Sequence, residues 1–246
     1  MLDPVRAFGR AASDLDVVFG LRPADELATE VLARCLGTDG AALRDWSLAR
    51  RLQALLAVRL ADDPDARAPA ATACSACGVR FELDIELARC VAPVDEVPLA
   101  WTSPQGNTVV LRLPRASDLQ AWRAAPQPGE AFLAGGLLLS LDGEAPPPDF
   151  EMPADWVEAL AEQLAERDPF TALEVDASCP DCGQVNATGV DIEALLLHDF
   201  AACQRRLLDE VTALARAFHW SEAQILELPA WRRAFYVDRL DGAGAA

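Results

Sequence analysis

Two copies of a C-x-x-C-G unit constrain this chain more than any other feature of its sequence. The four cysteines are Cys74, Cys77, Cys179 and Cys182. Two thiolates three residues apart can grip one metal ion from a tight turn, and the glycine that follows allows a positive φ. Two such units supply the four sulfur ligands of a closed tetrahedral site. We therefore expect one structural Zn²⁺ ion to join two halves of the chain that are distant in sequence.

The two cysteine units lie within a longer internal similarity. Pro64 of an Asp-Pro pair lies ten residues before the first cysteine unit, and Pro169 lies ten residues before the second. The two prolines are 105 positions apart, as are Cys74 and Cys179. An amphipathic helical pattern precedes each Asp-Pro pair, and an Asp-Ile-Glu triplet follows each unit. Each half therefore predicts a helix, a stop, and a hairpin with the cysteines at its turn, so that the two hairpins face each other across the metal.

The expected fold class is α+β and mostly α-helical. The two zinc-knuckle β-hairpins should combine into one zinc-ribbon-like four-cysteine site, with a long C-terminal helix and a helical corner after it. We expect a helical region (1–66), the first hairpin (67–90), a strand and helix insert (91–150), a helix with the second hairpin (151–190), and the long helix with two short helices (191–246). The hairpins and helices are expected to form one compact unit.

Apolar residues recur every three or four positions from Ile192 to Phe218. This spacing predicts one helix of about 40 Å at 1.5 Å per residue, with an apolar stripe that packs on this chain or partly on a partner. Ser221 and Gln224 form a capping box, so the chain should break at 219–220 and restart as a helix. Pro229 suits the first turn of a final helix.

Shorter signals predict the remaining elements. The pattern over 24–36 predicts a helix that ends at Gly37, and Asp45 is the expected cap of a longer helix that continues to about residue 61. A strand is expected over 107–113. Ser117 and Gln120 form the capping box expected to open the next helix.

Charge and cysteine number limit the possible partners and compartment. The net charge is −18, from 39 acidic against 21 basic residues, so a nucleic acid backbone would be repelled. The sequence has no export signal and no apolar run long enough for a bilayer, so we expect a cytoplasmic protein without membrane contact. Seven cysteines argue against a disulfide framework. Cys35, Cys90 and Cys203, which lack ligand spacing, are expected to be buried core thiols.

The sequence contains no recognisable catalytic arrangement. A nucleophile elbow, a phosphate loop and an H-E-x-x-H motif are all absent, and the two histidines, His198 and His219, are expected at the surface or at a helix end. We therefore expect no enzymatic activity and no small-molecule substrate. Two alternatives remain: a zinc-ribbon regulator that contacts nucleic acid, and a C-x-x-C thiol redox protein.

The C-terminal third resembles the T4-type baseplate hub assembly protein family of contractile phage tails and contractile injection systems. The motifs that carry the resemblance are CPDCG at 179–183, DIE at 191–193, LLDEV at 207–211, WSE at 220–222 and RRAFY at 232–236. FELD at 81–84 and VLRLP at 110–114 also fit, so the resemblance covers most of 45–240. It implies an assembly chaperone or minor component that binds baseplate hub or wedge proteins. The candidate partner-binding residues are Trp220, Ser221, Trp231, Arg232, Arg233 and Tyr236.

Overall fold

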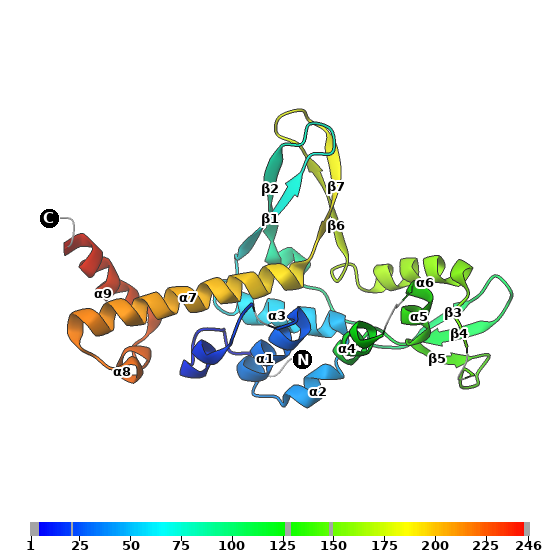
Figure 1. Cartoon of the computed structure of the whole chain (residues 1–246), viewed down its shortest axis with the longest axis horizontal. Coiled ribbons are helices and arrows are strands. Elements are labelled where there is room, and N and C mark those ends of the chain that lie inside the picture. Colours follow the sequence, from blue (N-terminus) through cyan, green and yellow to red (C-terminus); the bar gives the residue numbers. More distant parts are fainter. Residues whose placement is uncertain (1–4, 21, 126–128, 148–149, 244–246) are drawn as a thin grey trace.

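The computed structural model describes residues 5–20, 22–125, 129–147 and 150–243. Helix makes up 49% of the chain and strand 18%, and the sheets are small, which confirms the expected α+β class. Two hairpins project together from an elongated helical body, and a long helix runs from their base to one end of the molecule (Figure 1). We call the projecting part, residues 67–86 and 173–190, the hairpin tower.

The N-terminal quarter of the chain is helical. Its elements are the short 3₁₀ helix η1 (Ala12–Asp16) and the helices α1 (Ala24–Leu36), α2 (Gly40–Arg44) and α3 (Leu48–Leu60). Gly37, with a φ of 64°, ends α1 as the sequence predicts. The prediction that Asp45 caps the longer helix is wrong, because Asp45 ends α2. Ser47 caps α3 instead, with its hydroxyl accepting from the backbone N–H of Arg50.

The tower consists of two antiparallel hairpins. In the first, β1 (Arg67–Ala73) pairs with β2 (Arg80–Glu86). In the second, β6 (Leu173–Ser178) pairs with β7 (Val185–Val190). A two-stranded hairpin is only marginally stable by itself in water, so each needs further contacts. At the base these contacts come from the helical body, because Ala68, Ile85 and Val190 lie in its main core.

The insert between the hairpins forms a second small core. Its sheet has the order β3 (Leu99–Thr102), β4 (Thr108–Leu111) and β5 (Leu138–Leu141), and its helices are α4 (Ala116–Ala124) and α5 (Glu130–Gly135). Helix α6 (Ala154–Arg167) packs here as well, because its Trp156 and Leu160 share a buried cluster with Val109 and Leu111. The insert and α6 therefore form one packing unit beside the tower.

A carboxylate inside the first turn organises the start of α4. The helix begins at Ala116, so the predicted capping box of Ser117 and Gln120 is out of register. Asp118 accepts from the backbone N–H of Arg115 at 2.7 Å and from the guanidinium of Arg112 at 2.6 and 2.8 Å. These bonds satisfy a free N–H group at the helix start.

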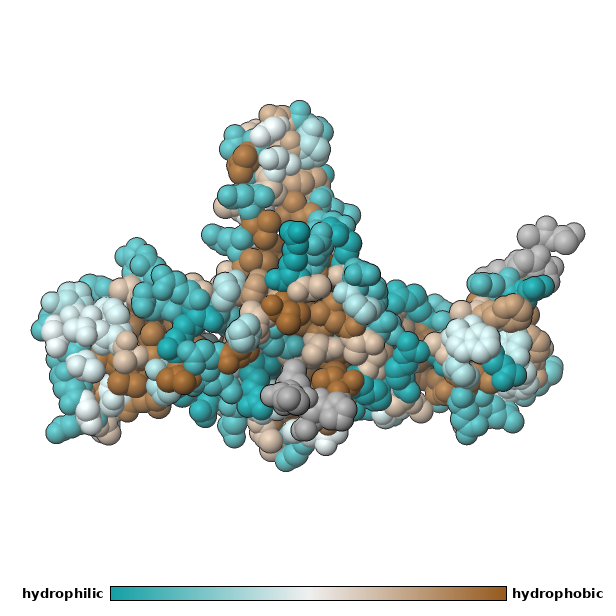
Figure 2. Space-filling view, turned by 180° about the vertical axis from the view of Figure 1, so that it is seen from behind, coloured by the Kyte–Doolittle hydropathy of each residue, from teal (hydrophilic) through white to brown (hydrophobic). Residues whose placement is uncertain are grey.

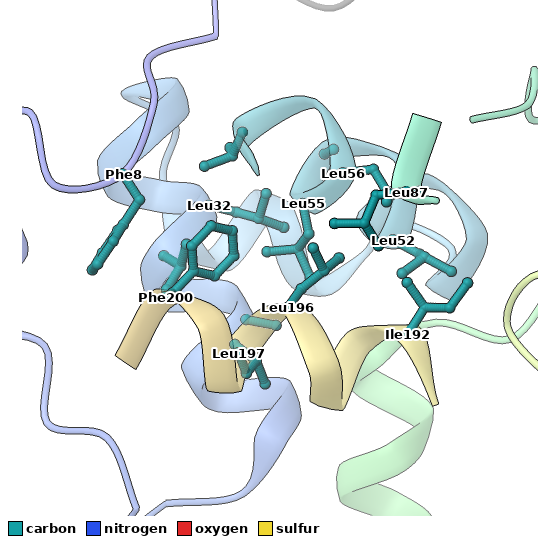
Figure 3. Packing of buried hydrophobic residues seen from close by; sticks show 14 of the residues in the cluster. Phe8, Leu32, Leu52, Leu55, Leu56, Leu87, Ile192, Leu196, Leu197 and Phe200 are labelled. Atoms are coloured by element: carbon teal, nitrogen blue, oxygen red, sulfur yellow. The ribbon is translucent and has the colours of Figure 1, made fainter. Parts of the chain in front are cut away.

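The predicted long helix is α7, which spans Ile192–Phe218 and 27 residues. After it, Ser221 caps α8 (Glu222–Leu226) through the expected exchange with Gln224, and α9 (Ala230–Ala243) ends the described chain. Leu196 and Phe200 in the first half of α7 pack into the main core beside Leu55 of α3 (Figure 3). The second half packs under α8 and α9 in a third cluster: Leu207, Val211, Leu214 and Ile225. The chain itself thus covers most of the stripe.

One polar side chain interrupts the buried stripe of α7. Gln204 is 8% exposed, and its amide nitrogen donates to the carbonyl oxygens of Asp14, Leu15 and Val17 at 2.9 to 3.1 Å. Buried amides and carbonyls are costly unless they are paired, so this side chain helps to hold the N-terminal segment against α7, together with the packing of Phe8 on Phe200.

Candidate metal centre

The four predicted cysteines meet at the tip of the tower. Their sulfur atoms all lie within 4.8 Å of one another. Across the two hairpins, the Sγ atoms of Cys74 and Cys182 are 3.6 Å apart, and those of Cys77 and Cys179 are also 3.6 Å apart. A tetrahedral zinc ion with Zn–S bonds of about 2.3 Å requires sulfur atoms roughly 3.8 Å apart. The cluster therefore has the size of a single four-thiolate metal site.

The two knuckles have the same backbone geometry. In each, the N–H of the first cysteine donates to the carbonyl five residues later, at 2.9 Å in the first knuckle and 2.8 Å in the second. The N–H of each glycine donates back to the carbonyl of that first cysteine at 3.0 Å. Gly78 and Gly183 have φ values of 74° and 73°, a region that side chains other than glycine rarely adopt. The matching geometry explains why both units need the glycine.

Backbone N–H groups lower the pKa of the cysteine thiols, whereas neighbouring thiols lower the pKa of Cys74 and raise that of Cys77. The pKa of Cys74 is lowered to about 6, because the backbone N–H groups of Cys77 and Ala76 donate to its sulfur. The backbone N–H of Val79 acts to lower the pKa of Cys77, but burial and the other three thiols raise it to about 12. Close thiols thus resist joint ionisation, and a bound divalent cation is the charge that would reverse this.

Two further contacts join the hairpins below the sulfur atoms. The side-chain oxygen of Asn186 accepts from the backbone N–H of Ser75 at 2.9 Å and from its hydroxyl at 2.8 Å. The hydroxyls of Thr72 and Thr188 lie 3.1 Å apart. The sequence reasoning missed these residues. The signal was the alternation of β7, which places Asn186 and Thr188 at inward positions normally occupied by apolar side chains.

The candidate partner-binding residues lie together at the far end of α7, but they face different ways. Trp220 stacks on Phe218 at a centroid distance of 4.8 Å and meets the ring of Tyr236 edge-on at 5.5 Å. Arg233 is 7% exposed and donates to Glu210 at 3.2 Å and to the carbonyl of Leu228 at 2.8 Å. Trp220, Tyr236 and Arg233 therefore hold α9 onto α7.

The opposite face of α9 is open to solvent. Trp231 is 71% exposed and Phe235, one turn later, is 49% exposed. The guanidinium of Arg239 lies 5.1 Å from the Phe235 ring, whereas that of the exposed Arg232 lies over Tyr236 and donates to its hydroxyl at 3.1 Å. Phe235 was not among the predicted candidates, although its i, i+4 spacing from Trp231 could have identified it. We call Trp231, Phe235 and Arg239 the outer stripe of α9.

The other thiols and the histidines lie apart from the metal centre. Cys35 and Cys90 are buried as expected, and burial raises the pKa of Cys35 to about 12. Cys203 is only half-buried. His198 is exposed, and His219 is exposed at the end of α7 with a φ of 57°. The cysteines of both C-x-x-C units lie in hairpin turns, whereas thioredoxin-type sites begin at a helix N-terminus.

Fold and site together define an α+β protein whose two hairpins meet at a four-cysteine cluster of metal-binding size. No protein-family model, no curated protein and no solved structure matches the chain. Over the described ranges, none of the helices has the length and apolar character that crossing a bilayer requires.

Proposed function

We propose that this protein is a zinc-stabilised, non-catalytic assembly factor for the baseplate of a contractile tail or injection apparatus. The observation that supports the zinc-binding part of this proposal is the cluster of Cys74, Cys77, Cys179 and Cys182, whose sulfur atoms lie within 4.8 Å of one another. Four thiolates are soft ligands that suit Zn²⁺, and they leave no open coordination position for a substrate. The metal would therefore hold the two hairpins together and would take no part in a reaction.

The baseplate role rests on the resemblance of the C-terminal motifs and on the surface that those motifs form. Trp and Arg are the residues that most often dominate binding energy at protein interfaces. Trp231, at 71% exposure, is the most exposed of the large hydrophobic side chains that the structure describes. Because Arg233 and Tyr236 fix α9 on its inner side, the outer stripe is presented on a rigid helix. We propose that it contacts a hub or wedge protein.

Metal analysis tests the zinc part of the proposal. Protein purified without chelators should contain one zinc ion per chain by mass spectrometry, and Cys179→Ser should lower the zinc content strongly. A matched control is Cys203→Ser, which removes a half-buried thiol away from the cluster. Metal-free wild-type protein, or stoichiometric iron in place of zinc, would contradict the proposal.

Binding assays with candidate partners test the assembly part. Hub and wedge proteins encoded near this gene should co-purify with the wild-type chain, and Trp231→Ala and Phe235→Ala should each weaken capture by about tenfold or more. Phe132→Ala is a matched control, because Phe132 is 56% exposed on α5, away from the stripe. Equal loss in the control would show that the stripe has no special role.

Mass spectrometry of finished particles separates the two forms of the assembly role. A transient chaperone should be absent from purified particles, although it binds the partner before assembly. If the chain is present at a fixed copy number, it is a minor structural component. Failure to bind any hub or wedge protein would overturn both forms.

A further inference from the structure

The two hairpins are related by an approximate twofold axis through the cysteine cluster. A shift of 105 positions converts Cys74 into Cys179 and Cys77 into Cys182. The same exchange converts the sulfur contact between Cys74 and Cys182 into that between Cys179 and Cys77, and both are 3.6 Å long. The metal centre is therefore symmetric, and any asymmetry in how the hairpins meet must come from other side chains.

The side chains next to the cysteines break this symmetry. Ser75, which donates twice to Asn186, has Pro180 as its equivalent, and Asn186 has Phe81 as its equivalent. Proline has no backbone N–H and no hydroxyl, and phenylalanine has no side-chain acceptor. The contact that joins the first knuckle to β7 thus cannot form at the related position between the second knuckle and β2.

The contact between Thr72 and Thr188 is asymmetric in the same way. Thr72 of β1 meets Thr188 of β7, and their equivalents under the same shift are Ala177 and Leu83. The Ser75–Asn186 and Thr72–Thr188 contacts therefore both join β1, or the turn that follows it, to β7. The related positions hold residues without side-chain hydrogen-bonding groups. The polar contacts between the hairpins are therefore asymmetric, although the cysteine positions are symmetric.

Asn186 is well placed to act as a clamp. It is 7% exposed, and its amide nitrogen donates to the carbonyl of Gln184 at 2.9 Å and more weakly to that of Ala177 at 3.4 Å. Its amide group is thereby fixed within the second hairpin. Its oxygen receives both donors of Ser75, which follows Cys74 directly. The clamp thus connects the backbone of one ligand-bearing turn to the strand that follows the other.

We propose that Ser75 and Asn186 are positioning residues that select the pairing of the first hairpin with the second and orient the cysteines for the metal. Two copies of the first hairpin would place Ser75 against Phe81. Two copies of the second would place Asn186 against Pro180. The second pairing leaves the buried oxygen of Asn186 without its donors, which is unfavourable, and the first leaves the exposed Ser75 without its acceptor. The metal alone cannot discriminate, because every pairing offers four thiolates.

Metal affinity tests the positioning role, which rests on the proposed metal site. Zn²⁺ competition against a chromophoric chelator should show that Ser75→Ala and Asn186→Ala each lower affinity by about tenfold or more, as is usual for groups that orient metal ligands. Because the two residues form one contact, the double variant should lose little more than either single variant. Val185→Ala, at an exposed neighbouring position, is the matched control.

A spectroscopic readout separates positioning from general destabilisation. Co²⁺ bound to the wild type should give the absorption of a tetrahedral thiolate site, and Asn186→Ala should alter this spectrum while the helical circular dichroism stays unchanged. If Asn186→Ala and Ser75→Ala bind Zn²⁺ and Co²⁺ as Val185→Ala does, the inference is wrong even though the metal site is real. A wild type that binds no metal would instead overturn the proposed function.

A mixing experiment tests the pairing role. One full-length chain carries Cys74→Ser and Cys77→Ser, and the other carries Cys179→Ser and Cys182→Ser, so that zinc can complete its ligand set only between two chains. Native mass spectrometry should show zinc-linked heterodimers in excess of the statistical 1:2:1 ratio, and Asn186→Ala should abolish the excess. If the chains with Asn186 and the chains with Asn186→Ala both give the statistical ratio, the pairing role is wrong.

Discussion

The hairpin tower and the helical body are stabilised by different means within one chain. The body buries a large apolar cluster that includes Leu32, Leu55, Leu56 and Leu196, each fully buried. Near its tip, the tower is joined by the cysteine cluster and by the Ser75–Asn186 and Thr72–Thr188 contacts. In Figure 2, hydrophobic and hydrophilic residues alternate over the tip, whereas hydrophobic residues gather where the tower joins the body. Apolar burial can stabilise a thick body, but a narrow projection requires a cross-link.

Metal removal should separate the two regions most clearly. Structural zinc contributes on the order of 10 kcal/mol to the folding of small zinc modules. Chelation, or Cys179→Ser, should therefore strongly increase amide hydrogen exchange over 74–80 and 179–185, while the exchange of α1, α3 and α7 changes little. Exchange measured by mass spectrometry reports both regions in one experiment. A parallel loss of protection in the body helices would show that the tower is not an independent unit.

A cavity in the main core should destabilise the helical body and leave the tower unaffected. Leu196 is fully buried between α7 and the N-terminal helices, so Leu196→Ala should lower the free energy of unfolding by about 2–5 kcal/mol. Zinc affinity should stay unchanged, because the cluster lies at the distant tip. Leu208→Ala is the control on the same helix, since Leu208 is 40% exposed and should cost less than about 0.5 kcal/mol. Denaturant unfolding measures both effects.

Loss of the Gln204 amide should have a smaller and more local effect. Gln204→Ala leaves the carbonyls of Asp14, Leu15 and Val17 without this donor, at an expected cost of about 1–3 kcal/mol. Exchange over 12–18 should rise before that of the tower. Gln163→Ala on α6 is a control, because Gln163 makes only a long hydrogen bond at the surface. Unchanged exchange over 12–18 would mean that other contacts hold this segment.

Acid should act on the insert through Asp118. Burial favours the neutral carboxyl, but the guanidinium of Arg112 and the backbone N–H of Arg115 outweigh it, so the pKa of Asp118 is lowered. A lowered pKa means that the contribution is complete above the unfolded value of about 3.9 and is lost as the pH falls through the folded value. Asp118→Asn should lower the free energy of unfolding at neutral pH, because the carboxylate that Arg112 and Arg115 stabilise is then absent. It should also flatten the dependence of unfolding on pH below about 4.

Local patterns in the sequence predicted the parts of this fold that depend on local spacing. Cysteine spacing identified the knuckles, and apolar periodicity identified α7 together with its break at His219. The three-stranded sheet was not predicted beyond one strand, since β3 and β5 are defined by pairing with β4. Cross-hairpin side-chain contacts were also missed. Asn186 and Ser75 are 111 positions apart, and no local pattern links them.

The position of α7 late in the sequence has a consequence for synthesis on the ribosome. The apolar faces of α1 and α3, which end at Leu36 and Leu60, are covered by α7, which begins at Ile192. At about 5–20 residues per second, translation of the intervening segment takes on the order of ten seconds. During that time the apolar faces of α1 and α3 remain exposed on the nascent chain until α7 covers them. Folding of the body must therefore await the synthesis of α7.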